Sequence, residues 1–200
     1  MNDQGVPPRR ALFVIDVQND FTEGGALEVT GGAAVAARIS DLLTRDPDAY
    51  EHVFASRDWH DGAGDNGGHF ASDGAPDFVV TWPVHCVAGT AGAEYHPALD
   101  TARVTVHVLK GQGKPAYSIF EGVTDDGSTV YDKLKQLGIT HIDLAGIATD
   151  HCVLASARDA IHSGRTVRVF RDLVAGVAAE SSEKALAALA DAGATITDSA

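Results

Sequence analysis

Cys152 stands at a point in the sequence where a thiol could be prepared for nucleophilic chemistry. Apolar residues predict a strand over residues 141–147, and helical spacing predicts a helix over residues 151–163. In the first turn of a helix, unpaired N–H groups and the helix dipole favour a thiolate and could also hold an oxyanion. A free cysteine is as often a small buried apolar side chain. This segment alone leaves both interpretations open.

Asp16 and Lys110 also lie at the ends of predicted strands. Asp16 falls near the end of the apolar run at residues 11–17, and Lys110 follows the one at residues 103–109. A carboxylate in an apolar strand is costly unless it is paired or used. Parallel strands end at one edge of a sheet, where open α/β folds bind ligands, so both residues are expected near Cys152. A buried ion pair would explain Asp16 and Lys110 alone equally well, but a cysteine at the same edge favours catalysis.

A second cluster has the residue types of a metal site. Asp58 and His60 stand two positions apart at the end of a predicted strand, and His69 and His85 lie in the long loop that follows. A single loop histidine is more often simply solvated, but three of them near one aspartate favour a metal. Carboxylate and imidazole ligands suit Zn²⁺, Fe²⁺ or Mn²⁺, with water at open positions, and the residue types do not choose among these ions.

Composition and charge narrow the class of protein. The chain has 200 residues, 44% of them hydrophobic and 22% charged, which is typical of a soluble globular protein and predicts one domain over residues 1–200 with a polar N-terminal tail at residues 1–10. The net charge of −13 argues against nucleic acid or an anionic membrane as a partner. No segment resembles a signal peptide or a membrane span. Two distant cysteines, Cys86 and Cys152, suggest no disulfide framework and favour the reducing cytoplasm.

Strands and helices are predicted to alternate along most of the chain. The predicted strands are residues 11–17, 52–58, 103–109, 141–147, 166–170 and 194–197, and the predicted helices are residues 31–46, 128–137, 151–163 and 181–192. This alternation predicts an α/β fold: one three-layer domain with a doubly wound, mostly parallel sheet of about six strands and helices on both faces. The exception is residues 59–102, where aromatic and histidine side chains in a Gly-rich and Asp-rich stretch indicate an ordered, functional loop.

Seven short motifs carry a family resemblance. They are Asp16-Val-Gln-Asn-Asp-Phe21, Gly24-Gly-Ala-Leu27, Asp58-Trp-His60, Trp82-Pro-Val-His-Cys86, Lys110-Gly111, Tyr117-Ser-Ile-Phe-Glu-Gly122 and Gly146-Ile-Ala-Thr-Asp-His-Cys152. In this order, and over roughly residues 11–197, the chain resembles the nicotinamidase/pyrazinamidase family of the isochorismatase-like cysteine hydrolases. Agreement in so many motifs is far more specific than any one of them.

The resemblance implies a metal-dependent amidohydrolase that converts nicotinamide to nicotinate and ammonia through a thioester, with pyrazinamide as an expected second substrate. It implies a catalytic triad in which Asp16 takes the thiol proton, Lys110 stabilises the charged set and Cys152 is the nucleophile. The backbone N–H groups of Ala148 and Cys152 would form the oxyanion hole, with a cis peptide bond between Ile147 and Ala148.

The resemblance also implies a metal site and a pocket for the ring. Asp58, His60 and His85 would hold one divalent ion, with His69 as a fourth ligand in some relatives. The metal would orient the pyridine nitrogen directly or through a bound water. The residues that would line the ring pocket are Phe21, Trp82, Tyr117, Ile147 and His151.

Other functions stay open at this point. A relative in the same superfamily could cleave another amide or a carbamoyl group, although the Asp58, His60 and His85 set favours nicotinamide. Vinyl-ether hydrolysis of the isochorismate type is disfavoured because it needs no nucleophilic cysteine. A non-catalytic metal-binding or regulatory protein could share the fold, but the joint presence of Asp16, Lys110 and Cys152 speaks against it. The partner expected from the resemblance is the small molecule nicotinamide, and the sequence leaves both a monomer and a homo-oligomer open.

Overall fold

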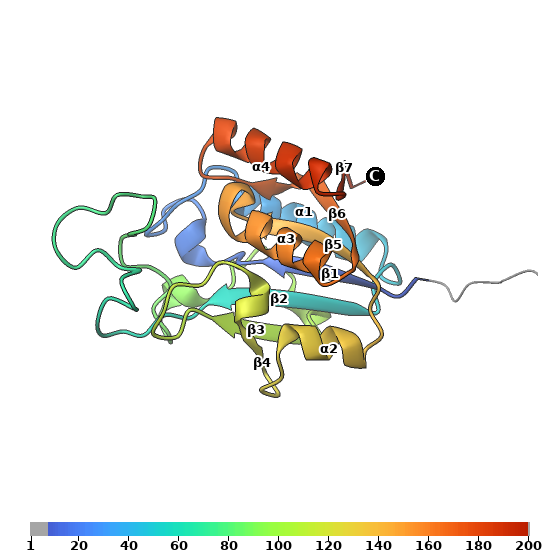
Figure 1. Ribbon diagram of the computed structural model, residues 1–200, viewed down its shortest axis with the longest axis horizontal. Helices are drawn as coiled ribbons and strands as arrows, with labels where there is room; N and C mark the ends of the chain where they lie inside the picture. Colours follow the sequence, from blue (N-terminus) through green and yellow to red (C-terminus); the bar gives the residue numbers. More distant parts are fainter. Residues whose placement is uncertain (1–7, 200) are drawn as a thin grey trace, which may run out of the picture.

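An apolar strand, β1 (Arg10–Ile15), runs through the middle of the sheet in the computed structural model, which describes residues 8–199. In this part of the chain the sheet has seven strands in the order β4-β3-β2-β1-β5-β6-β7 (Figure 1). The other strands are β2 (His52–Asp58), β3 (Val106–Lys110), β4 (Val123–Thr124), β5 (His141–Ile147), β6 (Thr166–Ala175) and β7 (Thr195–Thr197). All neighbouring strands in it pair in parallel except β3 with β4. The predicted α/β class and mostly parallel sheet are confirmed.

Helices cover both faces of this sheet. They are α1 (Gly32–Arg45), α2 (Val130–Gln136), α3 (Leu154–His162) and α4 (Ala179–Asp191). Successive side chains of a strand point to opposite faces, and β1 therefore serves two cores: Leu12 and Val14 pack in the cluster that includes α1, whereas Phe13 and Ile15 pack with residues of α2, α3 and α4. The result is the predicted three-layer arrangement.

Some predicted boundaries were wrong. The antiparallel strand β4 was not predicted, because two residues carry no readable periodicity. β6 continues five residues beyond the predicted end at residue 170, to Ala175. β3 begins at Val106 rather than at residue 103, because a 3₁₀ turn occupies Thr101–Arg103. The predicted polar tail, residues 1–10, lies mostly outside the described residues, and Arg10 already belongs to β1.

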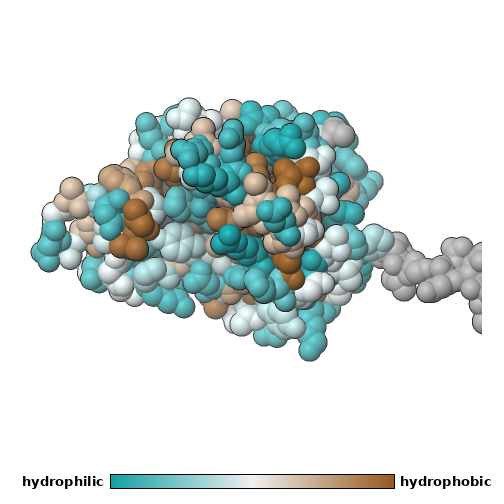
Figure 2. Space-filling model, turned by 45° about the horizontal axis from the view of Figure 1, so that its top comes forward, coloured by the Kyte–Doolittle hydropathy of each residue, from teal (hydrophilic) through white to brown (hydrophobic). Residues whose placement is uncertain are grey.

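The long connection between β2 and β3 projects from the end of the sheet at which β2 finishes (Figure 1). Backbone bridges pair His60 with Val87 and Phe70 with Trp82 inside this segment, so it is folded against itself as predicted. Apolar side chains are also exposed on this projecting part of the molecule, as Figure 2 shows, and they include Phe78, Val79, Val80 and Val84.

Among residues 8–199, the structure contains no helix with the length and apolar character needed to cross a membrane.

Candidate active site and metal centre

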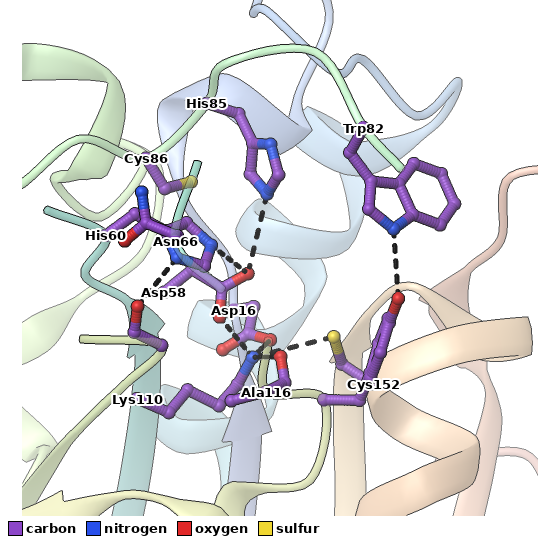
Figure 3. A network of polar contacts seen from close by, with 12 residues as sticks. Asp16, Asp58, His60, Asn66, Trp82, His85, Cys86, Lys110, Ala116 and Cys152 are labelled. Carbon is purple, nitrogen blue, oxygen red and sulfur yellow. Dashed lines mark hydrogen bonds and ion pairs between the residues drawn. The ribbon is translucent and has the colours of Figure 1, made fainter. Parts of the chain in front are cut away.

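Lys110 connects Asp16 and Cys152, the two residues predicted to lie beside it at the edge of the sheet. Its Nζ atom lies 2.9 Å from Asp16 Oδ2 and 3.6 Å from Cys152 Sγ, and it also forms an ion pair with Asp58 Oδ1 (Figure 3). Lys110 and Asp16 are fully buried, and Asp58 and Cys152 nearly so. The structure thus brings Asp16, Lys110 and Cys152 together as predicted and adds Asp58 as a second partner of the ammonium group.

Neighbouring strand ends explain this convergence. Asp16 directly follows β1, Lys110 ends β3, and Asp58 ends β2 opposite Lys110 in the parallel register. Asp16 has a φ of 46°, in the left-handed region that non-glycine residues rarely adopt. Its Oδ1 accepts a hydrogen bond of 2.7 Å from Ser56 Oγ, which leaves Oδ2 toward the lysine.

Cys152 lies in a different local structure from the predicted one. It belongs to a π-helical turn, Thr149–Val153, which precedes α3, whereas a regular helix was predicted from residue 151. Isolated π turns often occur at functional sites. Burial raises the pKa of the Cys152 thiol well above its usual value, although Lys110 partly opposes this shift. The buried thiol therefore needs a proton acceptor before it can act as a nucleophile.

The carboxylate of Asp16 can act as this proton acceptor. Burial raises the pKa of Asp16 above its usual value despite the neighbouring Lys110, which makes its carboxylate a stronger base. Burial alone would lower the pKa of Lys110, but Asp16 and Asp58 outweigh it and hold that pKa well above its ordinary value. One ammonium group therefore stays charged beside two carboxylates and a thiol.

Three histidines lie next to this set. One nitrogen each of His60, His69 and His85 lies within 4.8 Å of the others, and all three side chains are buried. Asp58 Oδ2 is 3.7 Å from His60 Nε2 and 3.9 Å from His85 Nε2 (Figure 3). The resemblance gave His69 only as a fourth ligand in some relatives. In the structure, its ring lies in the same cluster as His60 and His85.

The cluster fits a divalent metal. His60 Nδ1 lies 2.8 Å from the Gly111 carbonyl and His85 Nδ1 lies 2.7 Å from the Pro83 carbonyl. Metal-bound histidines commonly use such a bond to a backbone carbonyl to aim the other ring nitrogen at the ion. Within residues 8–199, His60 Nε2 and both ring nitrogens of His69 have no hydrogen-bond partner, which is unusual for buried polar atoms and expected of metal ligands.

Protonation states agree with this fit. Burial lowers the pKa of His69 to about 4 and also lowers the pKa of His85, so both imidazoles are neutral near pH 7 and can act as ligands. Burial alone would raise the pKa of Asp58, but Lys110 and the histidines hold it well below its usual range. The carboxylate is therefore ionised, as a metal ligand must be.

Two residues, Gly111 and Gln18, help to fix the positions of the candidate metal ligands. Gly111 has a φ of 83°, and a Cβ atom there would lie 2.6 Å from the His60 ring, so only glycine leaves room for that histidine. The buried side chain of Gln18 donates to the Asp58 and Ala93 carbonyls at 2.8 and 2.9 Å and accepts from the Asp58 N–H at 2.8 Å. Gln18 thus anchors a candidate ligand residue by its main chain.

A pocket with a volume of about 430 Å³, including its open mouth, adjoins the Cys152 thiol and the histidine cluster. Its lining includes all the residues predicted for the ring pocket, namely Phe21, Trp82, Tyr117, Ile147 and His151, together with Ala148 and Cys152. Leu27, Val29 and Val177 complete an apolar wall. Leu27 falls within a matched motif, but Val29 and Val177 stand outside the motifs and were missed.

Three aromatic side chains of the pocket lining contact one another. Trp82 Nε1 donates a 2.9 Å hydrogen bond to the Tyr117 hydroxyl (Figure 3). The His151 ring lies edge-on to Trp82 at 5.1 Å and is stacked with Tyr117 at 6.3 Å between ring centroids. This aromatic wall suits a flat aromatic ligand.

Ala148 and Cys152, whose backbone N–H groups the resemblance assigns to an oxyanion hole, both line the pocket. The peptide bond between Ile147 and Ala148 is cis, as the resemblance implied. The Ala148 carbonyl accepts hydrogen bonds from His151 N at 3.0 Å and Val153 N at 3.1 Å, which turns the chain so that both Ala148 and Cys152 line the pocket.

Known proteins match this chain over nearly its whole length. The isochorismatase domain model matches residues 10–200. The nicotinamidase/pyrazinamidase of Mycobacterium tuberculosis is 50% identical over 177 residues, covering 88% of this chain and 92% of that protein.

Solved structures agree. The pyrazinamidase of Pyrococcus horikoshii in complex with zinc superposes with a TM-score of 0.81 at 35% identity, covering 96% of this chain and 99% of that one. The L. infantum protein PnC1 in complex with nicotinate gives a TM-score of 0.81 at 33% identity, covering 96% and 93%. The chain therefore belongs to the isochorismatase family and, within it, to the group of nicotinamidases and pyrazinamidases.

Proposed function

We propose that this protein hydrolyses nicotinamide to nicotinate and ammonia with Cys152 as the nucleophile. The observation that carries the proposal is the buried Lys110 ammonium, which contacts both Asp16 and Cys152, while Cys152 itself lines an aromatic pocket. A plain structural ion pair would need neither the cysteine nor the pocket. The names of the similar proteins support nicotinamide as the substrate.

The reaction begins with transfer of the Cys152 thiol proton to Asp16. The thiolate sulfur then attacks the carboxamide carbon, and backbone N–H groups of Ala148 and Cys152 stabilise the negative charge that develops on the amide oxygen. Asp16 then gives the proton to the amide nitrogen and the C–N bond breaks. Ammonia departs, and the acyl group remains bound to Cys152 as a thioester. Lys110 keeps the charged set together throughout, because its ammonium faces both the carboxylate and the sulfur.

Hydrolysis of the thioester completes the cycle. Asp16, unprotonated again after ammonia has formed, takes a proton from a water molecule as the water oxygen attacks the carbonyl carbon. The C–S bond then breaks, Asp16 returns the proton to the Cys152 sulfur, and the product acid loses its remaining proton to solvent and leaves as nicotinate. One carboxylate thus acts as a base and as an acid in both halves of the reaction.

Asp58, His60, His85 and His69 would hold one divalent ion, and its chemistry would be to orient the ring by binding the pyridine nitrogen or a water bonded to it. The donor set of one carboxylate and three imidazoles suits zinc, iron or manganese. The zinc in the Pyrococcus horikoshii relative supports zinc among these. The ring would lie between Phe21 on one side and the aromatic wall of Trp82, Tyr117 and His151 on the other.

Pyrazinamide is proposed as a second substrate, because a pocket built for a flat ring with one carboxamide does not distinguish strongly between one ring nitrogen and two. The pyrazinamidase names of the relatives support this extension. We also propose the cytoplasm as the compartment, supported by Cys86 and Cys152, which are both unbridged.

The deciding experiment is an ammonia-release assay with nicotinamide. We expect turnover by the purified protein, loss of turnover after treatment with a chelator, and recovery on addition of zinc, iron or manganese. The Cys152→Ala protein is the control for contaminating amidases. A protein that holds its metal and releases no ammonia from nicotinamide would refute the proposed function.

A further inference from the structure

The Ser56 hydroxyl forms two hydrogen bonds with one residue, Asp16. Ser56 Oγ donates to Asp16 Oδ1 at 2.7 Å and accepts from the Asp16 backbone N–H at 3.3 Å. Both residues are completely buried. A single hydroxyl therefore holds the side chain and the main chain of the same aspartate.

The main chain of Asp16 needs such support. Its φ of 46° lies in a region that costs a non-glycine residue free energy and persists only where the surroundings impose it. The Asp16 carbonyl accepts a 2.9 Å hydrogen bond from Gln18 N, which holds the turn on one side. The Ser56 bond to the Asp16 N–H holds it on the other side, from the neighbouring strand β2.

The two carboxylate oxygens of Asp16 have different surroundings. Oδ1 is held by Ser56, whereas Oδ2 lies 2.9 Å from Lys110 Nζ and, among residues 8–199, accepts no hydrogen bond. One oxygen each of Asp16 and Asp58 and the Cys152 sulfur lie within 4.8 Å of one another. Because Ser56 already bonds Oδ1, Oδ2 is the oxygen left free to exchange a proton with the sulfur.

We propose that Ser56 is a positioning residue for Asp16, which fixes the carboxylate so that Oδ2 exchanges a proton with Cys152. The inference rests on the proposed function, since it gives Asp16 the role of base. Ser56 and Asp16 are absent from the described residues that line the pocket. We therefore expect loss of the Ser56 hydroxyl to slow the chemical steps without changing how the ring binds.

Ser56→Ala tests this role. Without the hydroxyl, the turn at Asp16 relaxes and the carboxylate moves away from the sulfur. We expect kcat for nicotinamide to fall by up to about 100-fold, which is what misplacing a reacting group by about 1 Å can cost, with KM unchanged. Alkylation of Cys152 by iodoacetamide, followed by mass spectrometry, should slow as well, and Ser56→Thr, which keeps a hydroxyl, should restore both rates to within a few-fold.

Ser40→Ala is the matched control. The Ser40 hydroxyl is likewise hydrogen-bonded, to the Ala36 and Ala98 carbonyls at 3.1 and 2.8 Å and to Asp100 N at 2.7 Å, but it lies on α1 and does not line the pocket. Its loss should leave kcat and the alkylation rate of Cys152 unchanged, whatever it does to the melting temperature.

A double-mutant cycle separates a positioning role from general loosening of the fold. In an Asp16→Asn background, Ser56→Ala should slow the alkylation of Cys152 no further, because the residue through which it acts is already disabled. Equal slowing in both backgrounds would overturn the proposal, and so would wild-type kcat and alkylation in Ser56→Ala itself. Since alkylation needs no nicotinamide, a wild-type protein that fails to release ammonia refutes only the proposed function.

Discussion

The Lys110 ammonium lies 3.6 Å from the Cys152 sulfur, and both groups are withdrawn from solvent. When the thiol loses its proton, a negative charge appears on the sulfur. Because water is excluded here, the neighbouring ammonium stabilises this charge far more than it would in water. The sulfur is thus prepared for attack by the Lys110 side chain.

Cys152→Ala should abolish turnover of nicotinamide while the fold and the metal content stay as in the wild type, because the thiol is proposed as nucleophile and not as ligand. Circular dichroism and metal analysis of the variant check the second part. In the wild type, iodoacetamide should label Cys152 well before Cys86, whose thiol is buried and has its pKa raised by that burial without a lysine in contact. Preferential labelling of Cys86, or substantial activity in the alanine variant, would contradict the assignment.

His60→Ala and His85→Ala should each lose the metal and most of the activity, because an incomplete coordination shell binds an ion weakly. Metal content per chain, measured after dialysis against buffer, is the direct readout. His141→Ala is a suitable control, since its ring lies at the start of β5, at the opposite end from the cluster. His69→Ala should lower metal occupancy as well. Full occupancy in that variant would remove only His69 from the ligand set, whereas full occupancy without His85 would overturn the site.

Asp16→Asn separates a catalytic base from a structural ion pair. The amide has nearly the shape of the carboxylate but cannot accept the thiol proton, so kcat should fall by roughly 10²- to 10⁴-fold with only a modest change in melting temperature. If the variant unfolds, or if it turns over nicotinamide at the wild-type rate, Asp16 is structural and the first step of the mechanism is wrong.

Lys110→Met should destabilise the metal-free protein by about 3–5 kcal/mol, the usual cost of leaving a buried charge without its partner. Denaturant unfolding measures this loss. Lys184→Met is the control, because the Lys184 pair with Glu180 is exposed on α4 and such pairs contribute about 0–1 kcal/mol. A loss in Lys110→Met no larger than in the control would show that Lys110 does not neutralise the buried carboxylates.

The stability of Lys110→Met should also increase as the pH is lowered. Burial already raises the pKa of Asp16, and Lys110 is the main group opposing that shift. Without the lysine, the folded-state pKa rises further above the unfolded value, so the folded state binds more protons than the unfolded state. Stability is then regained as the pH falls through the folded-state pKa and lost as it rises. A pH-independent difference from the wild type would contradict this.

Much of the site was predictable because parallel strands end at one edge. Asp16, Lys110 and Cys152 each stand at the end of an apolar run, and the alternation of strands and helices fixes the edge on which they meet. The contact between Lys110 and Asp58 was not predictable, because it depends on the register that sets Asp58 opposite Lys110. Nothing in the sequence gives that register.

Ser56 and the π turn were missed for different reasons. Ser56 stands two residues before Asp58 on the same strand, so period-two alternation places both side chains on one face, and this signal could have found it. The π turn at Cys152 depends on two hydrogen bonds to a single carbonyl, that of Ala148. Residue types at positions 148–153 do not distinguish it from an ordinary helix start.

Gln18 has a consequence for the long loop that carries the histidines. Because one amide holds the main chain at Asp58 and at Ala93, the intervening segment is a closed ring whose ends are fastened at its base. Gln18 thus closes the ring at its base, and the pairing of His60 with Val87 and of Phe70 with Trp82 joins its two arms further out. A protease cut at the exposed tip around Phe78 to Val80 would therefore open the ring without detaching either arm, and His60 and His85, on opposite arms, would stay tethered beside the sheet.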